Sequence, residues 1–152
     1  MANPIVNASS VKCSMSCSLP PGVPNPKAPS YPVGLTAQFL VPPVNRVNVG
    51  GVPAANIMDT TGKVVFPPSN SCQSQTNPTV IAASNAATVA AVGTPMFVAA
   101  PCIPLFASPW TPGCTTCMLA GKPMLNNSSK LMCTMGGTLE VVNTAAKTVT
   151  IP

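Results

Sequence analysis

A six-residue phrase occurs twice in this chain and constrains its fold more than any other feature. Gly51-Val52-Pro53-Ala54-Ala55-Asn56 returns as Gly121-Lys122-Pro123-Met124-Leu125-Asn126. Each copy follows a β-prone run, and each is followed by a cysteine, Cys72 or Cys133. A strand, a Gly-x-Pro turn, small residues and a cysteine indicate one structural unit that is used twice.

The chain is poor in charge. Only 6% of its 152 residues are charged, against about a quarter in an ordinary soluble protein. The length predicts a single domain, residues 1–152. A surface with so few charges associates readily, so we expect it to be covered by a partner or to enter a membrane. The net charge of +5 reflects scarce acids, and the seven basic residues are scattered, which argues against nucleic-acid binding.

The composition also argues against catalysis. There is no histidine, and the two carboxylates, Asp59 and Glu140, lie far apart in the sequence. General acid–base catalysis needs a group that titrates near neutral pH, and a cysteine nucleophile would lack its usual histidine base. We therefore expect neither enzymatic activity nor a small-molecule substrate.

Residues 1–10 lack the basic and apolar regions of a secretory signal peptide. This predicts synthesis in the cytoplasm, where the seven cysteines would be reduced and would serve as metal ligands or buried thiols.

One α-helix is expected, over about residues 78–92. Asn77 is a good N-cap, and Pro78 suits the first helical position because its missing N–H would be unsatisfied there anyway. The following residues are rich in alanine, and Gly93 with Pro95 ends the helix. The apolar run 89–106 is interrupted by prolines, which argues against a membrane-spanning helix.

The remaining signals predict short strands, so the expected fold class is mainly β. A Pro-rich loop over 20–34, with six prolines, should carry no regular element. The expected strands are 10–14, 35–41, 44–49, 96–98, 114–120, 130–134, 138–143 and 147–151, with the last two paired as a hairpin.

Several stretches, in a consistent order, resemble the PAAR-like domain that was long described as of unknown function and is encoded with contractile injection systems. They are residues 10–15, 53–59, 67–72, 94–96, 101–104, 108–113 and 121–137. No single stretch is specific, but the series spans nearly the whole chain.

The resemblance implies a small cone of short β-strands that binds zinc near its vertex. Its broad base would cap a trimeric VgrG-like spike, one chain per trimer. The cone would sharpen the spike, and sheath contraction would drive it through the target envelope with transient membrane contact. Such a tip is assembled on a type VI secretion-like or phage tail-like particle and leaves the cell with it. No residues remain here for a separate effector domain.

Two features depart from the family pattern. Asn56 replaces the arginine that ends the family motif, and the histidines that commonly bind zinc are absent. An all-thiolate site is the physical substitute, because four cysteines form a closed tetrahedral zinc site.

Two sets of four cysteines are candidates for this site. The first set lies in or beside the stretches that resemble the family, and we call it the landmark set: Cys13, Cys72, Cys102 and Cys133. Spacing alone favours Cys13, Cys17, Cys114 and Cys117, which has the ligand pattern of a zinc ribbon. We favour the first set, and buried thiols without metal remain the simpler alternative.

Three further expectations concern function. A trimeric partner would require three similar faces, for which the two repeats and a degenerate strand pair near 35–49 are candidates. Asp59 is expected to cap a turn, whereas Trp110 is either a partner anchor or a packed loop residue. The alternatives to a spike tip are a membrane-active, pore-forming or binding protein and a free-standing zinc-stabilised module.

Overall fold

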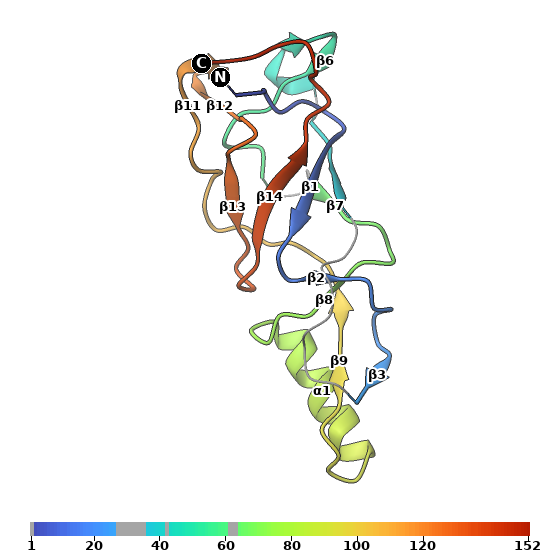
Figure 1. Ribbon diagram of the computed structural model, residues 1–152. Helices are drawn as coiled ribbons and strands as arrows, with labels where there is room; N and C mark the ends of the chain where they lie inside the picture. Colours follow the sequence, from blue (N-terminus) through green and yellow to red (C-terminus); the bar gives the residue numbers. More distant parts are fainter. Residues whose placement is uncertain (1, 27–35, 42, 61–63) are drawn as a thin grey trace.

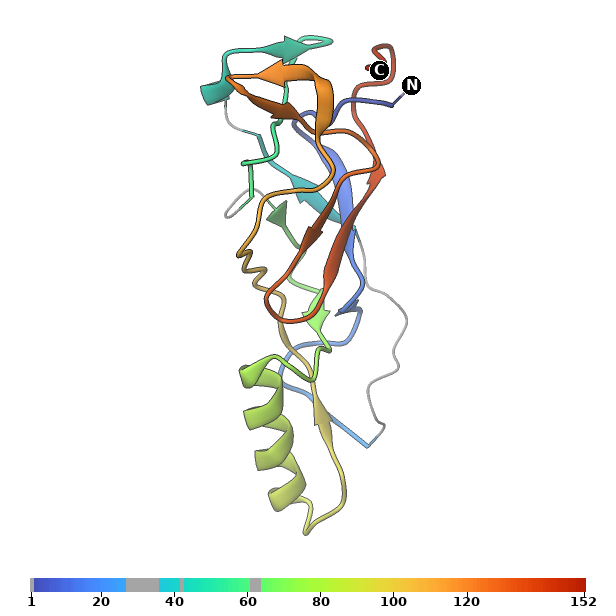
Figure 2. The same ribbon diagram turned by 90° about the vertical axis from the view of Figure 1, so that its left-hand side faces the viewer.

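The chain forms an elongated, mainly β structure with one α-helix, as the sequence predicts. The computed structural model describes residues 2–26, 36–41, 43–60 and 64–152. A β body occupies one end, and α1 (Pro78–Ala90) with β9 (Phe97–Val98) forms a narrower extension at the other (Figures 1 and 2).

The body is organised by a five-stranded sheet in which all neighbouring strands are antiparallel. Its order is β13 (Lys130–Met132), β14 (Thr138–Asn143), β1 (Ser9–Cys13), β4 (Ala37–Phe39) and β7 (Val64–Val65). Val11 in the central strand pairs with Val141 on one side and Ala37 on the other. Alternate residues of β1, namely Ser9, Val11 and Cys13, are buried, as expected for a strand with one face on a core.

Smaller sheets complete the fold. They are β2 (Ser16–Cys17) with β8 (Ser71–Cys72) and β10 (Ala100–Pro101), β3 (Pro24–Asn25) with β9, β5 (Asn48–Val49) with β6 (Val52–Pro53), and β11 (Cys114–Leu119) with β12 (Lys122–Met124). The β2–β8–β10 sheet lies between the body and the extension (Figure 1).

The helix begins where the sequence predicts. The Asn77 side chain accepts a hydrogen bond from the Thr79 N–H (3.0 Å), and Pro78 is the first helical residue. It ends at Ala90, two residues before the expected position, because Val92 and Gly93 have φ angles of 55° and 83°. Val80 is its buried residue, so most of the helix surface faces outward.

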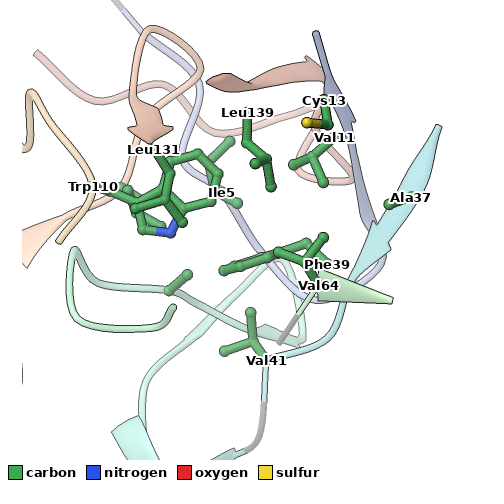
Figure 3. Close-up of a cluster of buried hydrophobic side chains, with 12 residues drawn as sticks. Ile5, Val11, Cys13, Ala37, Phe39, Val41, Val64, Trp110, Leu131 and Leu139 are labelled. Atoms are coloured by element: carbon green, nitrogen blue, oxygen red, sulfur yellow. The ribbon is translucent and has the colours of Figure 1, made fainter. Parts of the chain in front are cut away.

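The main core lies on the inner face of the five-stranded sheet (Figure 3). Phe39 and Trp110 meet edge to face, with ring centroids 5.7 Å apart, and both side chains are fully buried. The Trp110 Nε1–H donates a hydrogen bond to the Asp59 carbonyl oxygen (2.9 Å). Trp110 is therefore a packed core residue and not an exposed partner anchor.

Two expected strands and the expected Pro-rich loop differ from the structure. The strand expected over 44–49 is reduced to β5, because Pro43–Asn45 forms a 3₁₀ turn and the Asn45 amide donates to the Ala54 carbonyl oxygen (3.0 Å). The strand expected over 147–151 does not pair with β14; Ile151 instead bridges to Ala2. Within the Pro-rich segment, Pro24 and Asn25 pair with β9, whereas residues 27–35 lie outside the described residues.

Replacing Phe39 by alanine should lower the free energy of unfolding by about 3–5 kcal/mol, because it removes a large side chain from a closed core. Leu40→Ala, at the neighbouring exposed position, should change it by about 0.5 kcal/mol or less. Equilibrium urea unfolding of both variants measures the difference, and equal effects would contradict the core placement.

Candidate functional site

Three strand pairs lie together at the broad end of the body (Figures 1 and 2). In the β5–β6 hairpin Val49 pairs with Val52, and in the β11–β12 hairpin Leu119 pairs with Lys122. The third pair has no turn. It is formed by the two ends of the chain, where Ala2 and Ile151 exchange main-chain hydrogen bonds of 2.8 and 2.7 Å.

The first two pairs share their turn geometry. Gly50 and Gly51 have φ angles of 61° and 81°, and Ala120 and Gly121 have φ angles of 51° and 74°. Two consecutive positive φ angles are characteristic of the two-residue turn that matches strand twist in hairpins. This geometry explains the glycine that is common to the two sequence repeats.

Below the strand pairs, three segments form a closed ring that is held by main-chain hydrogen bonds. The segments are residues 3–9, 53–59 and 123–129. Their bridges are cyclic: Pro4 with Asn126, Val6 with Ala54, and Asn56 with Met124. The central bonds run from the Ile5 N–H to the Leu125 oxygen (3.1 Å), from the Leu125 N–H to the Ala55 oxygen (3.0 Å), and from the Ala55 N–H to the Ile5 oxygen (3.0 Å).

A second cycle of three main-chain hydrogen bonds joins the residues that lie two positions before and two positions after the central residue of each segment. Its members are the Asn7 N–H to the Pro53 oxygen (2.9 Å), the Ile57 N–H to the Pro123 oxygen (3.0 Å) and the Asn127 N–H to the Asn3 oxygen (3.0 Å). Equivalent residues of the three segments thus make equivalent contacts. The broad end has internal pseudo-threefold symmetry.

Each ring segment closes in the same turn. In each segment, the last bridging residue donates its main-chain N–H to the side chain three positions later. Ser9 accepts from Val6 (3.2 Å), Asp59 from Asn56 (2.9 Å) and Ser129 from Asn126 (3.2 Å). Asp59 therefore caps a turn, as predicted. Asn56 also has a local role, because its Oδ1 accepts the Met58 N–H (2.9 Å), as the Asn126 Oδ1 accepts the Ser128 N–H (3.0 Å).

The exposed charges at the broad end are all basic, and one lies in or beside each of the three strand pairs. Arg46 precedes β5, Lys122 begins β12, and Lys147 follows Ala146 in the C-terminal segment. All three are exposed. Of the two acids in the chain, Asp59 is buried, and Glu140 pairs with Lys130 (2.7 Å) on the five-stranded sheet.

The cysteines fall into two groups at different places in the fold. Cys13 ends β1, and its sulfur would lie 2.6 Å from a Cβ at Gly137. Cys133 donates its N–H to the Gly137 oxygen (2.7 Å), so Cys13 and Cys133 both contact Gly137. Cys72 lies in the central strand β8, and Cys102 directly follows β10, the neighbour of β8.

Burial and the neighbouring thiols both raise the pKa of two of these cysteines, Cys13 and Cys102. Burial, followed by the proximity of Cys133 and Cys72, raises the pKa of Cys13 to about 11. Burial also raises the pKa of Cys102 far above the ordinary thiol range, and Cys13, Cys72, Cys133 and Cys17 add to the shift. The four cysteines of the landmark set thus lie in one region where the body meets the extension; Cys13 and Cys72 are buried there, and Cys102 and Cys133 are partly exposed.

A family model described as "Domain of unknown function (DUF4280)" matches residues 5–145. The chain belongs to this family. No curated protein and no solved structure gave a significant match. The description of the family names no activity, partner or metal.

In this member of the family, the zinc-ribbon spacing does not correspond to a spatial cluster. Cys114 and Cys117 lie in β11 at the broad end, whereas Cys13 and Cys17 lie near the extension (Figure 1). Cys114 contacts Thr116 and the Pro152 oxygen. The landmark set is gathered more closely, yet among the described residues no three cysteine, aspartate or glutamate side chains are grouped as a metal centre.

The third ring segment was not found by sequence reasoning, which placed the third face near residues 35–49. The structure assigns it to residues 3–9, together with the C-terminal segment that bridges to Ala2 through Ile151. The signal that was available is an apolar residue followed four positions later by a turn-capping one, as in Ile5 and Ser9, Ala55 and Asp59, and Leu125 and Ser129.

The raised pKa of Cys13 predicts a loss of stability at alkaline pH. The unfolded thiol loses its proton near pH 9.0, whereas the folded one holds it to about pH 11. The free energy of unfolding should therefore fall across this interval, with about 2–3 kcal/mol due to Cys13. Urea unfolding with reductant and chelator should give a shallower fall for Cys13→Ala; equal slopes would contradict the assignment.

Proposed function

We propose that the protein is a PAAR-like spike tip that caps and sharpens a trimeric VgrG-like spike. The observation that carries this proposal is the closed ring of residues 3–9, 53–59 and 123–129, with its three strand pairs. A single chain meets a trimeric end without mismatch only if it offers similar contacts three times, because a three-fold end presents three identical edges.

The charges of the broad end favour an acidic partner. Arg46, Lys122 and Lys147 are exposed, one in each pseudo-equivalent unit. Complementary charge guides association and fixes register more than it raises affinity. A ring of carboxylates on the end of the spike would fit this pattern.

The opposite end suits contact with a target envelope. Residues 64–121 contain no lysine, arginine, aspartate or glutamate, and this range includes α1 and β9. Val89 and Val92, at its far end, are 79% and 94% exposed. An uncharged tip avoids the cost of moving ionised groups into a membrane interior.

We extend the proposal to a structural zinc ion held by Cys13, Cys72, Cys102 and Cys133. The donors fit in kind, because four thiolates form a closed zinc site, and burial together with the neighbouring thiols raises the pKa of Cys13 and of Cys102, which disfavours their ionisation without a cation. They do not yet surround one point in the described chain, so binding would have to draw them together. The metal would strengthen the joint between body and extension.

The runner-up function is a membrane-active, pore-forming or binding protein, which the uncharged extension favours. Among the described residues, no helix has the length and apolar character needed to cross a bilayer. An assay of vesicle leakage distinguishes the spike tip from the membrane-active protein. Leakage of lipid vesicles caused by the isolated chain would favour the membrane-active protein.

The docking proposal predicts a complex of one chain per spike trimer. After coexpression with a VgrG-like protein encoded beside it, native mass spectrometry should show a complex of one chain per spike trimer. Arg46→Glu and Lys122→Glu should each weaken binding by about tenfold at low salt, and Lys12→Glu, on the exposed side of β1, should not. A trimer that never retains the chain would refute the proposal.

The zinc proposal predicts about one equivalent of zinc per chain by elemental analysis, and a fall in melting temperature when a strong chelator is added. Cys133→Ser should abolish metal retention, because it removes one of four ligands. Cys114→Ser and Cys117→Ser should retain the metal. Zinc kept in Cys133→Ser but lost in Cys114→Ser would reverse the choice of ligands, and no zinc in the unaltered protein would refute both sets.

A further inference from the structure

Strand β11 contains an irregularity that brings two cysteines toward each other. Cys114 pairs with Met124 and Met118 pairs with Pro123, so four steps along β11 correspond to one step along β12. Thr115, Thr116 and Cys117 are looped out as a bulge. In a regular strand Cys114 and Cys117 would have Cα atoms about 10 Å apart, beyond the roughly 7 Å limit for a disulfide. A bulged strand bends locally, which allows a shorter separation.

One hydroxyl group lies close to both sulfur atoms. Thr116 Oγ1 is 3.5 Å from Cys114 Sγ and 4.0 Å from Cys117 Sγ. A main-chain oxygen of Pro152 also lies 3.5 Å from Cys114 Sγ. Cys114 is buried, whereas Cys117 is partly exposed. The pair thus has an accessible sulfur and a covered one.

The electrostatics of this pair differ from those of the other cysteines. The hydrogen bond from the Thr116 hydroxyl, assisted by the Cys117 thiol, lowers the pKa of Cys114, and the same interaction with Cys114 raises the pKa of Cys117. Burial instead raises the pKa values of Cys13, Cys17 and Cys102. Thiolate character, which thiol–disulfide exchange requires, is therefore favoured at Cys114.

We propose that Cys114 and Cys117 form a redox-active dithiol pair that closes to an intramolecular disulfide by exchange with a low-molecular-weight disulfide. The site lies in a strand pair of the broad end but does not depend on docking, so it is tested on the isolated chain.

Closure takes two exchange steps. The Cys117 thiolate attacks one sulfur of the small disulfide, whose S–S bond breaks and releases one thiolate. The Cys114 thiolate, stabilised by the Thr116 hydroxyl, then attacks Cys117 Sγ and expels the second thiolate. The protein loses two protons and two electrons, and the small disulfide is reduced to two thiols.

The test uses the full-length, reduced protein treated with chelator and then with oxidised glutathione. Intact mass and non-reducing peptide mapping should show the loss of two hydrogen atoms and one cross-link, Cys114 to Cys117, while the other five cysteines stay reduced. In Cys114→Ser, glutathione should remain attached to Cys117, because the second nucleophile is missing. In Cys117→Ser, the covered Cys114 should react more slowly than Cys117 does in the unaltered protein.

A matched pair of threonine variants tests the role of the hydroxyl. Thr116→Val should slow the release of the second glutathione by about threefold for each tenfold loss of Cys114 thiolate; Thr115→Val, one residue away, should leave the rate unchanged. A stable glutathione adduct in the unaltered protein would overturn the proposal. A faster cross-link among the buried cysteines would also overturn it, and equal rates for the two threonine variants would refute the role of Thr116.

Discussion

The structure depends on a ring of main-chain hydrogen bonds that joins Ile5, Ala55 and Leu125. These residues are far apart in the sequence, yet each donates to one of the others and accepts from the third. A strand of the five-stranded sheet follows each ring segment: β1, β7 and β13. The ring therefore fixes where those strands start and how the strand pairs of the broad end are spaced around them.

Because the ring is made by backbone groups, it places few demands on sequence. Pro4-Ile5-Val6, Ala54-Ala55-Asn56 and Met124-Leu125-Asn126 share little beyond size and the turn-capping residue that follows, yet they adopt equivalent positions. Buried backbone groups must be paired in any fold. Here that requirement yields three-fold symmetry from three unlike segments.

Several elements of the fold could be predicted from local signals. The helix start follows from Asn77 and Pro78, and two of the strand pairs follow from turns that need glycine at positive φ. The third pair could not be found in this way. Its strands are the two chain ends, so it has no turn and therefore no glycine signal. The strand expected over 44–49 failed because Pro43 and Asn45 form a turn that is tied to Ala54.

The cysteines illustrate the limits of spacing rules. Cys13-x-x-x-Cys17 and Cys114-x-x-Cys117 have the spacing of a zinc ribbon, but the topology sends them to different parts of the molecule. The landmark set, scattered over 120 positions from Cys13 to Cys133, lies closer together, because Cys13 and Cys72 are the last residues of β1 and β8, and Cys102 and Cys133 directly follow β10 and β13. The bulge in β11 is a local packing outcome that no motif indicates.

The union of the two chain ends has a consequence for assembly. Because Ala2 and Ile151 are separated by almost the whole chain, we expect their contact to form late in folding, once the segments between them have folded and shortened the loop to be closed. A truncated or partly folded chain would present two strand pairs of the three. Docked as proposed, it would leave one edge of the spike uncovered, so the geometry of the broad end would act as a quality check on incorporation.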